Sequence, residues 1–180
     1  MNSMKEELQS VLTFWLEEVD SEKHFKKDPE LDNEIRERFG ERVERAKAGE
    51  YDELLADARL RLAVIILLDQ FSRNIYRGQA EAFAGDRKAL ELSQTGIEAG
   101  LDQTLSKGEK HFFYMPLMHA EDSQVQKLSV EKFTELGEPK WALMHQAEIE
   151  KFSRFPGRNQ ALGRQSTPEE IEHLGNGGGF

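Results

Sequence analysis

The chain has 180 residues and a mass of 20.7 kDa, which fits one domain whose core needs no disulfide or metal to hold it together. With 34 Asp and Glu residues against 24 Lys and Arg, its formal net charge is -10, which argues against a broad nucleic-acid-binding surface. The sequence contains no cysteine, which excludes disulfides, thiol catalysis and thiolate metal sites.

The sequence patterns predict neither export nor membrane insertion. The first stretch, MNSMKEELQSVLTFWLEEV, lacks the basic start and the small-residue cleavage site of a secretory signal. The longest aliphatic run, LAVIILL, is far shorter than the roughly 20 residues needed to span a bilayer. We therefore expect a cytoplasmic protein with no membrane or nucleic-acid partner.

Helical periodicity predicts three helices in the first part of the chain. The first follows the i, i+3, i+4 spacing of one buried stripe, through Leu8, Val11, Leu12, Trp15, Leu16 and Val19. A second should start at Pro29, capped by Asp28, and stop at Gly49. A third is expected from about Asp52 through Leu68. Its last turns are apolar on nearly all sides, which predicts the central helix.

Helix signals continue to the end of the chain. A helix is expected from about Asp86 to Gln94 or Ile97, and Pro116 should kink or stop the next one. Two amphipathic helices should follow, one capped by Asp122 and one through Trp141 and Phe152. The last should begin with a capping box at Thr167, Pro168 and Glu170.

Strand signals are almost absent, so the sequence predicts an all-α fold. We expect a single domain over residues 1–174 with about seven to nine antiparallel-packed helices. The Gly-rich residues 175–180 should form a flexible tail.

A first group of polar side chains leaves the aliphatic run, in LLDQFSRNIYRG. It consists of Asp69, Gln70, Arg73, Asn74 and Arg77. If the helix continues, Asp69, Arg73 and Arg77 lie four residues apart on one face, where they could contact a ligand. Alternatively, this is a helix end whose arginines neutralise the helix dipole and pair with Asp69.

A second group, in MHAED, contains His119, Glu121 and Asp122. A histidine beside two carboxylates could bind a metal or act as an acid/base pair. Equally, Asp122 could cap the next helix while His119 binds a buried carbonyl group.

A third group runs from His145 to Arg164. His145 and Glu148 share one helix face, and the loop FSRFPGRNQALGR carries Arg154, Arg158, Asn159 and Arg164. Guanidinium groups bind carboxylate or phosphate through paired hydrogen bonds, so a rigid arginine-rich loop indicates an anion site. The alternative is a loop held by arginines that donate to backbone carbonyls.

The known catalytic and cofactor motifs give no further support. A metal site could combine His119, Glu121, His145 and Glu148, but helical di-iron proteins place glutamate before histidine, twice, and here the order is reversed and single. The sequence has no Gly-rich phosphate loop, no G-x-S-x-G and no H-E-x-x-H. We therefore predict no metal and no cofactor.

The segments LLDQFSRNIYRG, AFAGDRKAL, FFYMPLMHAED and FSRFPGRNQALGRQSTPEE together resemble the bacterial "domain of unknown function 924" family. The resemblance extends from VLTFWLEE to STPEEIEHL, and it implies an all-helical, tetratricopeptide-like superhelical fold with no established activity. The matched motif positions are Asp69, Gln70, Arg73, Asn74, Arg77, Asp86, His119, Glu121, Asp122, His145, Arg154, Pro156, Arg158, Asn159, Gly163 and Arg164.

Two positions depart from the pattern that this resemblance implies. His24 stands before Phe25 where many relatives have tryptophan, which puts an aromatic packing role there in question. Gly157 follows Pro156 where many have histidine, so a mechanism that needs that imidazole would fail here.

Three functions remain open at this point. The first is a binding module whose Arg/His-lined pocket holds a small anionic molecule or an acidic peptide end; in this hypothesis six side chains converge, from Arg73, Arg77, His119, His145, Arg154 and Arg158. The second is an acid/base hydrolase that uses His119 or His145 with Glu121 or Glu148. The third is a buried polar network that fixes the fold and binds no ligand. The oligomeric state is not predicted.

Overall fold

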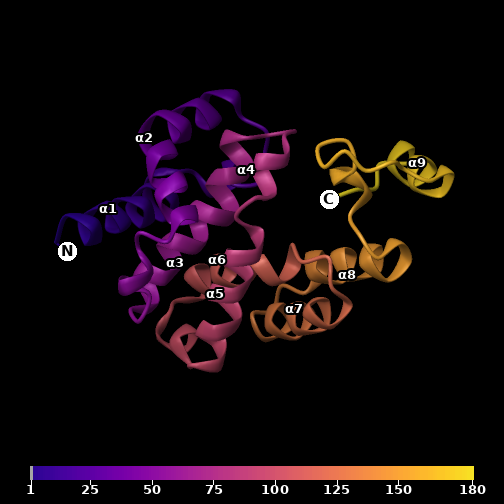
Figure 1. Ribbon diagram of the computed structural model, residues 1–180. Helices are drawn as coiled ribbons and strands as arrows, with labels where there is room; N and C mark the ends of the chain where they lie inside the picture. The colour runs from indigo at the N-terminus through magenta and orange to yellow at the C-terminus, as the bar shows by residue number, and fades with distance from the viewer. Residues whose placement is uncertain (1) are drawn as a thin grey trace. The chain divides into compact units, whose positions relative to one another are not determined.

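Helices make up all the regular secondary structure in the computed structural model, which describes residues 2–180 (Figure 1). The all-α prediction is therefore confirmed. The chain divides into two compact units, one formed by residues up to Arg77 with Glu81–Pro116, and one formed by Gly78–Ala80 with Leu117–Phe180. We describe each unit by itself. The single domain over residues 1–174 and the flexible tail at 175–180 stay predictions.

The first unit contains six α-helices among the described residues. They are α1 (Asn2–Thr13), α2 (Pro29–Ala48), α3 (Ala58–Ile66), α4 (Ser72–Ile75), α5 (Asp86–Glu98) and α6 (Lys107–Met118), whose last two residues belong to the second unit. Two π-helical turns extend them, η1 (Phe14–Glu18) after α1 and η4 (Leu67–Phe71) between α3 and α4. The apolar run thus lies in one continuous helical segment that extends from α3 through η4 into α4.

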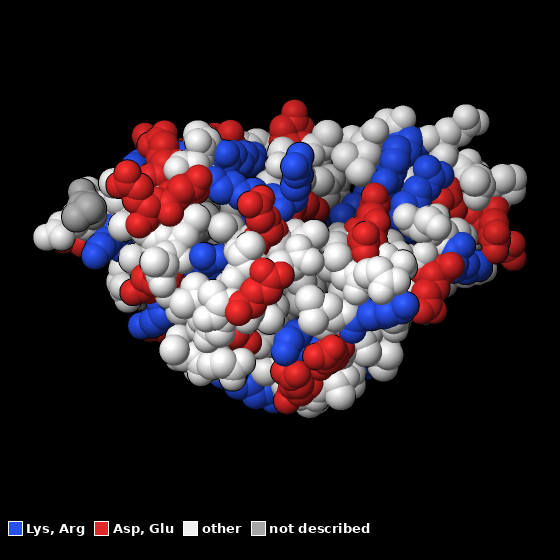
Figure 2. All heavy atoms as spheres, turned by 60° about the horizontal axis from the view of Figure 1, so that its bottom comes forward, with Lys and Arg blue, Asp and Glu red and all other residues white. Residues whose placement is uncertain are grey.

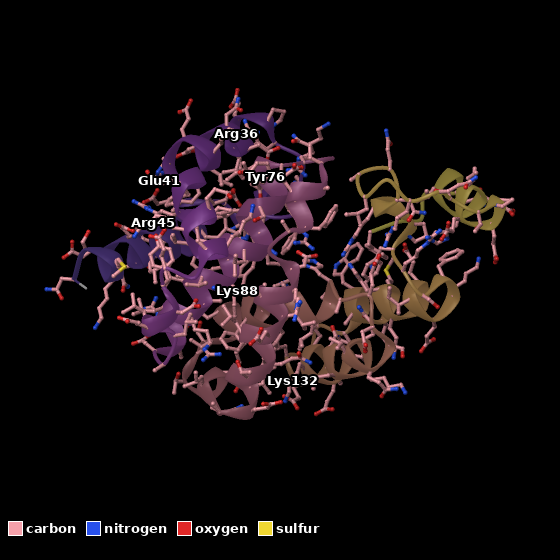
Figure 3. All side chains as sticks on the ribbon, in the orientation of Figure 1. Arg36, Glu41, Arg45, Tyr76, Lys88 and Lys132 are labelled. Atoms are coloured by element: carbon pink, nitrogen blue, oxygen red, sulfur yellow. The ribbon has the colours of Figure 1, made fainter. Side chains whose placement is uncertain are left out.

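The predicted ends of α2 are confirmed. The Asp28 carboxylate accepts from the N–H groups of Glu30 and Leu31, and Gly49 ends the helix with φ of 87°. Lys88 of α5, which is labelled in Figure 3, donates to the Ala46 carbonyl at 3.2 Å and to Asp52 at 2.7 Å. Both ends of α2 are therefore satisfied by side chains.

Two predicted boundaries are wrong. Residues Asp52–Leu54 form only a 3₁₀ turn, and α3 begins at Ala58, because the Asp57 carboxylate accepts from the N–H groups of Arg59 and Leu60. Helix α6 continues through Pro116 to Met118, so a stop at the proline is wrong, whereas the alternative, a kink, stays a prediction. A proline this near the end removes a single intrahelical hydrogen bond, and the turn tolerates that loss.

Aromatic rings form the centre of the first unit. Phe71 lies 5.1 Å from Phe39 and 5.3 Å from Trp15, measured between ring centroids. His24 packs on Trp15 at 4.3 Å and contacts its carbonyl oxygen through Nε2 at 2.8 Å. Burial lowers the pKa of His24 against the opposing effect of this hydrogen bond. His24 therefore takes part in aromatic packing in this chain.

The second unit is built on α7 (Ser123–Glu135) and α8 (Lys140–Phe152), which pack side by side (Figure 1). Asp122 caps α7 as predicted, accepting from the N–H groups of Gln124 and Val125. Ser153, in the left-handed region at φ 60°, ends α8 and turns the chain into the loop that carries the 3₁₀ turn η7 (Pro156–Arg158). Helix α9 (Pro168–Gly175) follows.

The surface carries both signs of charge. On the face drawn in Figure 2, acidic and basic side chains are interspersed rather than separated into single-sign areas. No helix among residues 2–180 has the length and apolar content that a membrane span requires.

Candidate functional site

Arg73 is the centre of the polar group in the first unit. Its guanidinium donates to both carboxylate oxygens of Asp86, at 2.8 and 2.9 Å. It also lies 3.0 Å from the carboxylate of Asp69, whose side chain is 1% exposed and accepts from Gln70. Burial lowers the pKa of Arg73, but the two carboxylates outweigh it and the pKa is raised above the ordinary value. Arg73 is thus a half-buried cation that is paired with two carboxylates of its own unit.

Arg77 belongs to a separate pair. Helix α4 ends at Ile75, so Arg77 lies beyond the helix that was expected to place it on the face of Asp69 and Arg73. Its guanidinium donates to both oxygens of Asp32, each at 2.8 Å, and Asn74 donates to the same carboxylate at 2.8 Å. This pair joins α2 to the end of α4.

The π-helical turn η4 lies at the start of this group. The N–H of Ser72 bonds to the carbonyl of Leu67, five residues back, so the turn is wider than an α-helical one. Asp69 and Gln70 lie within it and are both buried. The turn therefore holds polar side chains inside the unit, where Asp69 accepts from Gln70 and pairs with Arg73 of α4.

In the second unit, Glu121 holds the loop that follows α8. Arg164 donates to its two oxygens at 2.7 and 2.9 Å, and the Phe155 N–H donates to it at 2.8 Å. Burial raises the pKa of Glu121, but Arg164 and the Phe155 N–H outweigh burial and the pKa is lowered. Glu121 is therefore a carboxylate committed to internal partners.

A second ion pair continues the same network. Arg154 donates to both oxygens of Glu170, at 2.7 and 2.9 Å. Asn159 connects the two pairs, since its amide donates to Glu170 at 3.2 Å and its oxygen accepts from Arg164 at 2.9 Å. Glu170 also completes the predicted capping box with Thr167. The loop and α9 are thus joined through one continuous set of charged hydrogen bonds.

The Arg154 hydrogen bond, with the Thr167 N–H, lowers the pKa of Glu170 to about 2. Because a free glutamate titrates at about 4.3, this carboxylate stabilises the fold fully above that pH, and the contribution is lost as pH falls toward 2. We expect Glu170→Gln to be less stable than the wild type at pH 7 and to lose less stability between pH 4.5 and 2. Urea midpoints across this range measure it.

The exposed Glu172→Gln, on the same helix, should keep the wild-type dependence on pH and serves as the control. Equal acid sensitivity of Glu170→Gln and the wild type would contradict the assignment of this pKa.

Two histidines of the second unit, His119 and His145, lie near the ring of Phe155. His145, which is buried, contacts the Trp141 carbonyl through Nδ1 at 2.8 Å, so this nitrogen carries the proton. Its ring lies 6.1 Å from His119 and 5.5 Å from Phe155 between centroids. The guanidinium carbon of Arg158 lies 4.3 Å over the Phe155 ring. We call His119, His145, Phe155 and Arg158 the His145 cluster.

The residues of the proposed acid/base pairs have other partners as well. Both oxygens of Glu121 accept from Arg164, and Glu148 lies 3.4 Å from His173 of α9. Within residues 2–180, no three His, Asp or Glu side chains are grouped so that they could hold a metal ion. The acid/base role of these residues stays a prediction.

The predicted residues thus fall into two groups. Asp69, Gln70, Arg73, Asn74 and Arg77 belong to the first unit, and His119, Glu121, His145, Glu148, Arg154, Arg158, Asn159 and Arg164 belong to the second. Convergence of the two groups in one pocket stays a prediction. Sequence reasoning missed Asp32, although its place on the buried stripe of α2, three residues before Ile35, marks it as unusual.

The fold and these groups define an all-α protein whose polar motifs are matched largely by its own carboxylates. Its sequence matches the family described as "Bacterial protein of unknown function (DUF924)" over residues 11–178. A solved structure of a protein of unknown function from Agrobacterium tumefaciens is similar, with a TM-score of 0.92 and 35% identity over 96% of this chain and 99% of that chain. The comparison with curated proteins gives no match. The chain belongs to the DUF924 family, as the motif resemblance predicted.

Proposed function

We propose that the protein is a binding module whose ligand site is the His145 cluster of the second unit. The observation that carries this proposal is the fixed His145 ring, held by the Trp141 carbonyl, with a second histidine and an arginine around it. Imidazole and guanidinium groups donate hydrogen bonds to carboxylate and phosphate oxygens. The ligand is therefore a small anion or the acidic end of a peptide.

The other arginines of the motifs serve as framework. Arg73, Arg77, Arg154 and Arg164 each donate two hydrogen bonds to one internal carboxylate. A ligand would have to displace that carboxylate and leave it buried, which is costly. These pairs hold α2, α4, α5 and the loop after α8 in place, and the Glu121 pair in particular positions Phe155 beside His145.

A thermal unfolding series tests the proposal. A panel of phosphate, citrate, nucleotides and acidic peptides is added to the wild type, to His145→Ala and to Arg158→Gln. A ligand at a hundred times its Kd adds about 2.7 kcal/mol, which raises the Tm of a domain of this size by about 5–10 °C. We expect this rise in the wild type and its loss in both variants.

The control is Arg38→Gln, which removes an exposed guanidinium from the first unit and should keep the full rise. A rise of equal size in His145→Ala and Arg158→Gln would place the ligand elsewhere. A panel that shifts none of the proteins would leave only the framework role.

A further inference from the structure

The last residue of this sequence packs on the His145 cluster. The ring of Phe180 lies 3.8 Å from that of His145 between centroids, with 24° between their planes, which is a stacked arrangement. Phe155 and Trp141 meet the same ring nearly edge-on, at 6.5 and 6.4 Å. Stacked and edge-on contacts are the two arrangements that aromatic pairs prefer. His145 and Phe155 of the cluster, together with Trp141, therefore form three sides of a site for one aromatic ring.

The residues before Phe180 fit because they have no side chains. A Cβ added to Gly178 would collide with the His173 ring, and one added to Gly179 would lie 2.5 Å from Leu174 Cδ2. Gly179 also has φ of 108°, which other residues rarely adopt. On the opposite side, a Cβ on Gly157 would lie 3.0 Å from the Phe180 carbonyl oxygen. The backbone of residues 178–180 is thus in close contact with α9 and η7.

This packing gives a reason for Gly157 in this chain. The position is expected to hold histidine in many relatives, and here a side chain would meet the backbone of Phe180. Gly157 leaves room for the Phe180 backbone, and Gly178 and Gly179 leave room for the side chains of α9. The site and the segment that fills it therefore both depend on glycine for their close contact.

We infer that the His145 cluster is a peptide-binding site for an aromatic side chain that follows glycine, and that residues 178–180 occupy it as an intramolecular ligand. The inference rests on the proposed function and names its ligand class. A partner peptide must compete with the attached segment, so its apparent affinity is reduced by the fraction of molecules in which the site is open. Removing the Phe180 ring should therefore strengthen binding.

Calorimetric titration of the peptide Gly-Gly-Gly-Phe into the wild type and into Phe180→Ala tests this inference. We expect binding to Phe180→Ala that is roughly tenfold tighter than to the wild type, corresponding to a tail that fills the site in about nine molecules of ten. Gly-Gly-Gly-Ala is the control peptide and should not bind. The peptide acid and its amide are both used, so that the contribution of a carboxylate is separated from that of the ring.

The outcomes separate this inference from the function proposed above. Equal binding of Gly-Gly-Gly-Ala and Gly-Gly-Gly-Phe acids would overturn the aromatic specificity while supporting an anion site. If phosphate or citrate still raised the Tm but neither peptide bound, the aromatic specificity would likewise be overturned and the anion site supported. If no anion raised the Tm and no peptide bound, both proposals would be overturned. A wild-type dimer that Phe180→Ala abolishes, seen by light scattering, would overturn the intramolecular assignment in favour of a tail bound by a second copy.

Tryptophan emission gives an independent measurement on the full chain. Trp141 is 51% exposed and lies against Phe180, whereas Trp15, the other of two tryptophans, is fully buried in the first unit. Gly157→Ala should displace the tail and shift the Trp141 emission in the same direction as Phe180→Ala. Gly108→Ala, where an added Cβ meets nothing within 4 Å, should leave the spectrum unchanged. A spectrum of Phe180→Ala identical to the wild type would overturn the inference.

Discussion

Replacing Arg73 by methionine is expected to lower the free energy of unfolding by about 3–5 kcal/mol. The substitution keeps most of the apolar stem of the side chain but removes the cation between Asp69 and Asp86. Asp69 is 1% exposed and would remain as a buried charge without its guanidinium partner. Urea denaturation at pH 7, with extrapolation to water, measures the loss.

The matched control for this prediction is Arg38→Met. Arg38 also pairs with two carboxylates, Glu34 and Glu18, but it is 41% exposed, so its loss should cost less than about 1 kcal/mol. If Arg73→Met were as mild as the control, Asp69 would have to gain a proton or water on loss of its partner. A steeper dependence of its stability on pH would then reveal the protonation.

The parts of the fold that depend on neighbours in sequence were predictable. Asp28, Asp122 and Thr167 each cap a helix whose first N–H groups lie two or three residues away. Such contacts form between residues that any window of the sequence contains together. The start of α3 was placed too early, near Asp52, because Asp57 was not identified as the residue that caps it.

The partners of the polar motifs were not predictable in this way. Arg77 binds Asp32 across 45 positions, and Arg164 binds Glu121 across 43. The sequence identified both arginines as unusual and suggested an external anion, whereas the anion that each contacts is a carboxylate from another helix or turn. Only the packing of the helices decides between an internal and an external partner for the same guanidinium group.

The position of Phe180 is the clearest case of information absent from the sequence pattern. A Gly-rich end is typical of a mobile segment, because glycine has the largest conformational entropy to lose. Here the same lack of side chains permits close approach to His173 and Leu174. The composition is therefore compatible with both a free tail and a tightly packed one, and the flexibility of residues 175–180 stays a prediction.

Replacing Phe71 by alanine is expected to lower the free energy of unfolding by about 3–5 kcal/mol, the usual cost of a cavity left by a buried ring. Phe71 is fully buried and meets three other rings, those of Phe14, Trp15 and Phe39. Phe25→Ala removes a ring that is 63% exposed in the same unit and should cost far less. Urea denaturation of both variants gives the comparison.

The result for Phe71 also bears on the polar motif that surrounds it. Phe71 is the last residue of the π-helical turn that contains Asp69 and Gln70. Its buried ring therefore holds in place the turn whose Asp69 pairs with Arg73. If the ring fixes this turn, Phe71→Ala should weaken the coupling energy between Arg73 and Asp86, measured in a double-mutant cycle in each background. An unchanged coupling energy would mean that the charged network holds the turn without the core.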